Sequence, residues 1–360
     1  MKNLITILLF IVAVASCTPP EVGYIDDNIH ALQDTIFVPR GTFLLSAVPA
    51  VEGSTYPLEW EITGITDADG NPTDELFEKH TITTWKAAYN PETDTTLELA
   101  KAKIQQTEEP SILISPVSGE IAFTGATKFV KEDIFKINVK VKNVKGERQL
   151  DNFVVVKLLP FAAVEFPTEM RSRLQLGKDD GSYDIGYTSS IKNGDDPESK
   201  KVLDGTHPYI SVIKTSDEPA IGINVKMTIA DSYDTPLDTD KIIFYPTGST
   251  FLQNYHDNST ETTTNATNTI FSLPAPPFPQ YARTYSGNNS YLMYYLTKPT
   301  AFTVEKEAFE ADNGAKDWTK YIDANTGEIR NRAYIRWGIK INDSGTWEIK
   351  MKIPYTKIKK

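Results

Sequence analysis

The stretch that decides the fold is Phe135-Lys-Ile-Asn-Val-Lys-Val-Lys142, in which apolar residues alternate with polar ones. A period of two is typical of a β-strand with one face in a core and the other in water. The same alternation recurs around Trp60, over residues 333–341 and over residues 347–353. We therefore predict an all-β protein in which each of these rows faces a core.

Other segments predict the connections and the few helices. Asn342-Asp-Ser-Gly345 lies between the last two rows and predicts a hairpin that joins them. Residues 153–159 are nearly all apolar and predict a strand buried on both faces. Residues 305–311 and 318–322 predict one or two short helices, whereas residues 97–106 fit either a helix or a strand. The threonine-rich tract over residues 247–269 predicts a flexible loop.

Residues 111–159 resemble the last half of bacterial cadherin-like or immunoglobulin-like modules. The resemblance is carried by Gly119-Glu-Ile-Ala-Phe123, the alternating strand and Val144-Lys-Gly146. It implies an immunoglobulin/cadherin-like β-sandwich over residues 35–160. Prolines at 160 and 167 bracket a domain boundary. The strand signals beyond it predict a larger, jelly-roll-like sandwich over residues 165–360, as the domain that binds a ligand.

Length and charge agree with two domains and exclude some partners. The 360 residues fit two domains at roughly 150 residues each. The 37 basic and 48 acidic residues give a net charge of −11. This charge disfavours a nucleic-acid partner, which requires a basic face. A single cysteine excludes an intramolecular disulfide.

The N-terminus reads as an export signal. Lys2 precedes an apolar run over residues 4–15, which is followed by Ser16 and Cys17 and so gives the segment Val14-Ala-Ser-Cys17. The run is shorter than the ~20 residues that a membrane-spanning helix needs. The segment resembles a bacterial lipoprotein signal. That resemblance implies cleavage of residues 1–16, lipidation of Cys17, attachment to a membrane through the lipid, and a tether over residues 17–34. Thr18, in place of an aspartate, implies the outer membrane.

The whole arrangement resembles the outer-membrane lipoproteins of Bacteroidetes polysaccharide-utilisation systems. The resemblance implies a non-catalytic, surface-facing protein that binds a polysaccharide or oligosaccharide, with an outer-membrane transporter as a further partner. Two alternatives stay open. One is an adhesin or fimbrial-type subunit that assembles by strand donation. The other is a glycoside hydrolase, which needs only two suitably spaced carboxylates.

No motif predicts a cofactor. The four histidines are far apart in sequence, and the zinc, nucleophile-elbow and phosphate-loop patterns do not occur. One loop has alternating carboxylates typical of a calcium site, although it does not follow the EF-hand order. Its candidate ligands are Asp67, Asp69, Asn71 and Asp74. A turn stabilised by these same residues is the commoner explanation of such a sequence.

Aromatic residues are the natural candidates for glycan binding, because a flat ring presents an apolar face to the C–H face of a sugar. Trp60, Trp337 and Trp347 lie in phase with the apolar rows of their strands, which predicts core positions. Trp318 shares a predicted helical face with Tyr321 and Ile322, which also predicts a core position. The remaining tryptophan and the proline-stiffened segment over residues 271–295 predict a glycan platform. Its candidate residues are Trp85, Phe278, Tyr281, Arg283 and Tyr285. Rings that merely cover the end of the sandwich are the commoner alternative.

Overall fold

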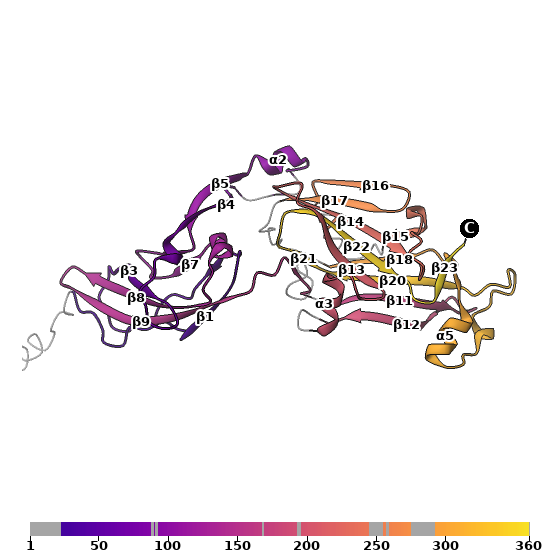
Figure 1. Ribbon diagram of the computed structural model, residues 1–360, viewed down its shortest axis with the longest axis horizontal. Helices are drawn as coiled ribbons and strands as arrows, with labels where there is room; N and C mark the ends of the chain where they lie inside the picture. The colour runs from indigo at the N-terminus through magenta and orange to yellow at the C-terminus, as the bar shows by residue number, and fades with distance from the viewer. Residues whose placement is uncertain are drawn as a thin grey trace, which may run out of the picture. The chain divides into compact units, whose positions relative to one another are not determined.

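The computed structural model describes residues 23–87, 90, 93–167, 169–192, 196–244, 255–256, 259–274 and 292–359. The chain divides into two compact units. The first contains residues 1–82 and 106–161, and the second contains residues 83–105 and 162–360. Figure 1 shows that strands dominate both units, so the all-β prediction is confirmed.

The first unit is a β-sandwich. One sheet has the order β1 (Thr35–Pro39), β9 (Gly146–Leu159), β8 (Ile134–Asn143) and β3 (Glu59–Thr66). The other has the order β2 (Leu44–Leu45), β7 (Ile121–Phe123) and β6 (Ile112–Ile114). The strand β1 pairs in parallel with β9, so the first and last strands of the sandwich are neighbours. Two short 3₁₀ helices, η1 (Glu75–Phe77) and η2 (Gly125–Phe129), connect these strands.

The stretch quoted at the outset forms β8, and its apolar residues are core residues of this sandwich. Phe135, Ile137, Val139 and Val141 are all fully buried. Trp60 is also buried, and its ring lies where a β-carbon on Gly119 would stand, which explains the glycine in the module-like motif. Their burial removes apolar surface from water, which is the main driving force for this unit.

Two predictions for this unit were wrong. Residues 153–159 are not buried on both faces, because Lys157 is exposed and the burial of β9 alternates. The second wrong prediction is the tether over residues 17–34, of which residues 23–34 are described. Ile29 is a core residue, and Asp26 accepts a hydrogen bond at its backbone oxygen from Arg148. Residues 23–34 therefore belong to the folded unit, because the isoleucines in this segment are needed to complete its core.

A further hairpin-like pair, β4 (Lys79–Trp85) and β5 (Ile104–Pro110), forms its own two-stranded sheet. Between them lies α2 (Leu97–Lys101), which Thr96 caps by accepting a hydrogen bond from the backbone N–H of Leu99. Residues 97–106 thus contain both of the structures that the sequence allowed.

The second unit is a larger sandwich of two five-stranded sheets. We call the first the β11 sheet. It has the order β12 (Tyr183–Ile191), β11 (Met170–Gly177), β20 (Asn331–Gly338), β18 (Leu292–Thr297) and β15 (Ile242–Phe244). We call the second the β22 sheet. It has the order β13 (Ile210–Ser216), β22 (Gly345–Lys352), β14 (Ile223–Ala230), β17 (Thr269–Leu273) and β16 (Glu261–Thr264).

Smaller elements complete this unit. Two short pairs flank the main sheets, β10 (Val164–Glu165) with β21 (Lys340–Ile341) and β19 (Phe302–Val304) with β23 (Thr356–Ile358). The helices are α3 (Pro197–Leu203), α5 (Lys306–Asn313), η3 (Thr239–Lys241) and η4 (Trp318–Tyr321). The helix α3 was missed, although Asp196-Pro197 is a helix-start signal: Asp196 caps the helix and proline occupies the first turn.

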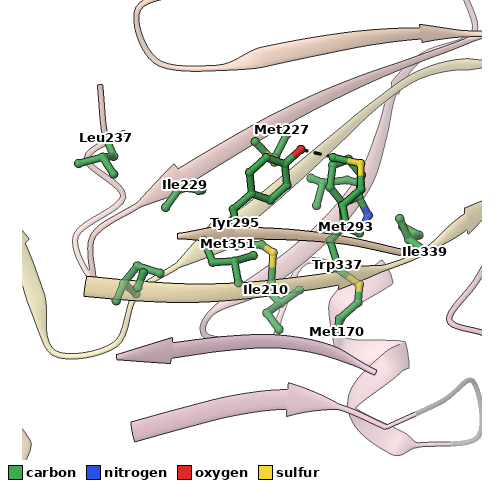
Figure 2. Packing of buried hydrophobic residues seen from close by; sticks show 14 of the residues in the cluster. Met170, Ile210, Met227, Ile229, Leu237, Met293, Tyr295, Trp337, Ile339 and Met351 are labelled. Carbon is green, nitrogen blue, oxygen red and sulfur yellow. Dashed lines mark hydrogen bonds between the residues drawn. The ribbon is translucent and has the colours of Figure 1, made fainter. Parts of the chain in front are cut away.

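The core of the second unit lies between its two sheets. Figure 2 shows Met170, Met293, Met351, Trp337 and Tyr295 packed between strands of both sheets. The hydroxyl of Tyr295 donates to the Sδ atom of Met293 at 3.8 Å, and burial raises the pKa of Tyr295 well above its ordinary value. All four tryptophans predicted to be core residues are buried.

The predicted hairpin at Asn342-Asp-Ser-Gly345 was wrong. The row over residues 333–341 lies mainly in the β11 sheet, whereas the row after the turn forms β22 in the opposite sheet. There β22 pairs antiparallel with β13 and in parallel with β14. Both rows face the same core from opposite sides, so their alternation looks the same as that of a hairpin. The threonine-rich tract also contains a strand, β16, rather than loop alone.

Candidate functional site

The outward face of the β11 sheet carries an unusual set of side chains. Along β11 the residues Met170, Ser172, Leu174 and Leu176 are buried, so the residues between them point outward. The strand β20 alternates in the same way, with Ala333, Ile335 and Trp337 in the core. We call the outward set the Arg–Tyr face; it consists of Arg171, Arg173, Gln175, Tyr294, Leu296, Arg332, Tyr334 and Arg336.

Strand register brings these side chains into rows across the sheet. Arg171 lies opposite Arg336, which lies opposite Tyr294 on the next strand. In the next row Arg173 lies opposite Tyr334, which lies opposite Leu296. Opposed residues on neighbouring strands are close enough for direct contact, so the cationic and aromatic groups form one continuous surface.

Aromatic rings and guanidinium groups contact one another within the Arg–Tyr face. The rings of Tyr294 and Tyr334 lie 5.7 Å apart at an angle of 50°. The guanidinium carbon of Arg173 lies 5.7 Å from the ring centre of Tyr334, and that of Arg336 lies 5.9 Å from the ring centre of Tyr294. These distances are in the range of cation–π attraction. Burial raises the pKa of Tyr334 to about 12, so its hydroxyl group stays protonated at neutral pH.

The neighbouring row extends the surface. Arg332 donates from Nε to the side-chain oxygen of Gln175 at 3.0 Å, and its guanidinium carbon lies 3.6 Å from the ring centre of Tyr183. A β-carbon on Gly177 would lie 3.1 Å from the ring of Tyr183, so the glycine leaves room for that ring beside the strand. The arrangement suits an extended ligand: flat rings pack against apolar faces, and guanidinium groups donate hydrogen bonds.

Sequence reasoning missed the Arg–Tyr face. A signal was present, because Arg332, Tyr334 and Arg336 occupy the out-of-phase positions of an apolar row that predicts a strand. The sequence pattern does not show which strands pair. The strands β11 and β20 are distant in sequence, and only the fold brings their arginines together.

Most of the predicted glycan platform lies outside the described residues, namely Phe278, Tyr281, Arg283 and Tyr285. Trp85 is described and is partly exposed at the end of β4, on a different sheet from Tyr294. At the ends of the same aromatic segment, Phe271 and Tyr295 are core residues, whereas Tyr294 belongs to the Arg–Tyr face. Cys17 also lies outside the described residues.

The calcium candidate forms a closed turn. The carboxylate of Asp67 accepts hydrogen bonds from the backbone and the side-chain nitrogen of Asn71, at 2.8 and 3.1 Å. These bonds hold the pKa of Asp67 below its ordinary value. Asp69 and Asp74 are also among the described residues, and no group of three or more metal-binding side chains is found there. The geometry is that of a turn stabilised by its own side chains, and calcium binding stays a prediction.

The described carboxyl groups give the hydrolase alternative no support. A general acid requires a carboxyl group whose pKa is raised. Every described aspartate or glutamate whose pKa clearly departs from its ordinary value is instead shifted downward; these are Asp67, Asp94, Asp180, Asp184, Asp196, Asp204, Asp234, Glu310, Asp317 and Asp323. The hollow beside Ile36 and Phe153 in the first unit has a volume of about 10 Å³, which holds one water molecule rather than a sugar.

In the described part of the chain, no helix has both the length and the apolar composition that crossing a membrane requires.

Comparison with known proteins gives only distant likenesses. No family model matches the chain, and no curated protein matches its sequence. One similar solved structure is a SusE-like, surface-located polysaccharide-binding protein from the heparin utilisation locus of Bacteroides thetaiotaomicron, with 11% identity and a TM-score of 0.23. The match covers 91% of this chain and 53% of that one, so this chain spans about half its length.

Another similar structure contains the four N-terminal immunoglobulin domains of Dscam1, with 7% identity and a TM-score of 0.20. That match covers 92% of this chain and 74% of the other. Likenesses at this level carry no argument about ligands, and the site is therefore argued from the residues of this chain.

Proposed function

We propose that this chain is a non-catalytic lipoprotein of the outer-membrane surface that binds polysaccharide. The observation that carries the proposal is the Arg–Tyr face, where Tyr294 and Tyr334 stand beside several hydrogen-bond donors on one rigid sheet. Residues on the strands of a packed sandwich are held more firmly than residues on loops, so this face is preorganised for a ligand. The first unit would then serve as a spacer.

The proposed location at the outer membrane rests on the N-terminal sequence. The apolar run ending in Cys17 is the segment that resembles a lipoprotein signal. In the native cell, the Cys17→Ser variant should lose incorporation of radiolabelled fatty acid and leave the membrane fraction. Equal labelling of the variant and the wild type would contradict lipidation at this cysteine.

Binding is tested with residues 18–360 and a panel of neutral and acidic polysaccharides, by affinity gel electrophoresis followed by isothermal titration. We expect at least one member to bind, and we expect Tyr334→Ala to weaken that binding about tenfold, because central aromatic residues carry much of an interface's affinity. The matched control is Tyr233→Ala, since Tyr233 is 62% exposed and contacts Glu305 away from the Arg–Tyr face.

Two results would contradict the proposal. One is that no polysaccharide in the panel binds. The other is that Tyr334→Ala and Tyr233→Ala bind as tightly as the wild type, which would place any glycan site elsewhere on the chain.

A further inference from the structure

The Arg–Tyr face holds more positive charge than the carboxylates of the described residues neutralise. Its four arginines are Arg171, Arg173, Arg332 and Arg336. Glu169 pairs with Arg171 and lies 3.6 Å from Arg336. Among the described residues, no carboxylate forms an ion pair with Arg173 or Arg332. This excess occurs in a chain with a net charge of −11, in which carboxylates are plentiful.

Several lysines on the other main sheets are paired with carboxylates, in contrast to Arg173 and Arg332. On the β22 sheet, Lys226 pairs with Glu348 at 3.3 Å, and Lys350 and Lys352 both pair with Asp234. On the first unit, Lys140 of β8 lies between Glu61 and Glu147. Those cations neutralise neighbouring carboxylates, as expected of surface residues that only keep a sheet in water.

The arginines are also too buried to be ordinary solvent-facing charges. The side chains of Arg171 and Arg336 are only 16% and 25% exposed. The Nε atoms of Arg171 and Arg173 are buried and have no hydrogen-bond partner among the described residues. Burial, and then the charges of Arg173 and Arg336, hold the pKa of Arg171 below its ordinary value. Like charges packed together in this way are unfavourable until a counter-charge arrives.

The spacing of the arginines suits repeated negative groups. Neighbouring strands lie about 4.8 Å apart, and alternate residues along a strand lie about 6.7 Å apart. The four guanidinium groups therefore form a small lattice rather than a single point of charge. Guanidinium groups form paired hydrogen bonds with planar carboxylates and with the oxygens of sulfate or phosphate. Tyrosine rings beside them supply the apolar contact that a sugar backbone needs.

We propose that the Arg–Tyr face binds an acidic polysaccharide, through sulfate or carboxylate groups seated on Arg171, Arg173, Arg332 and Arg336. The inference deepens the proposed function and rests on it.

The test uses ligands that differ only in charge. Residues 18–360 are titrated with dextran, carboxymethyl dextran and dextran sulfate of matched length, and with heparin and polygalacturonate. We expect at least one acidic series to bind ten times more tightly than dextran, with affinity that falls as salt is added. The affinities then distinguish the two acidic groups. Tighter binding of carboxymethyl dextran and polygalacturonate would indicate carboxylate, and tighter binding of dextran sulfate and heparin would indicate sulfate.

Variants locate the site. Arg173→Gln should weaken acidic binding about tenfold. Glu169→Gln should leave it unchanged or strengthen it, because it removes a carboxylate that competes with the ligand for Arg171 and Arg336. The matched control is Lys350→Gln on the β22 sheet, which should bind as the wild type does. If Arg173→Gln and Lys350→Gln give the same affinity, the inference is overturned.

A stability measurement separates a ligand-binding role from a structural one. Without ligand, the Tm of Arg173→Gln should equal or exceed that of the wild type, because the substitution relieves repulsion between like charges. A fall of several degrees would make Arg173 a structural residue and overturn the inference.

The remaining outcomes distinguish the two proposals. Binding to neutral glycans alone, sensitive to Tyr334→Ala but not to Arg173→Gln, would overturn the acidic ligand and leave the proposed function standing. Failure of every polysaccharide to bind would overturn both. Polythymidylate bound as tightly as the acidic glycans, with the same dependence on Arg173, would replace the polysaccharide with a nucleic acid.

Discussion

Replacing Trp337 with alanine should remove about 3–5 kcal/mol from the free energy of unfolding of the second unit. Trp337 is fully buried on β20 and lies at the centre of the core in Figure 2. Its ring stacks on Tyr255 at 4.6 Å and lies 6.0 Å from Phe271. Alanine would leave a cavity that residues from both sheets cannot fill without moving, and the cost grows with the volume left empty.

The measurement is unfolding in urea or guanidinium chloride, with calorimetry to follow the second unit. Trp337→Phe should cost clearly less, because it keeps a ring and removes an indole N–H that has no hydrogen-bond partner among the described residues. Ile213→Ala is the exposed control, since that side chain is 42% exposed, and should cost under about 1 kcal/mol. A loss for Trp337→Ala no larger than that of Ile213→Ala would contradict this account of the core.

Replacing Gly345 with alanine should be comparably destabilising, for two independent reasons. Gly345 has a φ of 119°, a conformation that costs other residues about 1–3 kcal/mol. An added β-carbon would also clash with the carbonyl oxygen of Ser216, and overpacking of this kind costs about 1–3 kcal/mol more. The backbone N–H of Gly345 donates to the carbonyl of Gly222 at 3.0 Å, so the strand end cannot simply move away.

Two other glycines separate these contributions. Gly181 has a φ of 80° but nothing within 4 Å of an added β-carbon, so Gly181→Ala should show the conformational cost alone. Gly146 has neither a positive φ nor a nearby atom, so Gly146→Ala should be close to neutral. Thermal unfolding of the three variants should rank Gly345→Ala as the least stable and Gly146→Ala as the most stable. Equal Tm values for Gly345→Ala and Gly181→Ala would rule out the clash with Ser216.

The sequence was informative about strands and faces, because alternation is a local property. Phe135, Trp60, Trp337 and Trp347 lie in the cores where their phase predicted them. Which strands pair with one another was harder to predict. Whether Asn342-Asp-Ser-Gly345 closes a hairpin or carries the chain to the opposite sheet depends on β13 and β14, which lie far away in sequence.

The candidate site was unpredictable for the same reason. At the ends of the aromatic segment over residues 271–295, Phe271 and Tyr295 face the core and only Tyr294 lies on the Arg–Tyr face, while the predicted platform residues between them lie outside the described residues. The arginines of β11 and β20 look like ordinary solvent-facing residues when each strand is taken alone. That four arginines share a single described carboxylate partner, Glu169, becomes visible only when the register places Arg171 opposite Arg336.

The position of β22 also has a consequence for the order in which the second unit acquires its structure. This strand is formed by residues 345–352, yet it lies between β13 and β14 inside its sheet. Neither neighbour can complete its ladder of hydrogen bonds until those residues have emerged from the ribosome. Such distant pairings fold slowly and leave strand edges exposed meanwhile. A nascent chain that stalls before residue 345 should therefore depend on chaperones, whereas the first unit already holds all of its sandwich strands by residue 159.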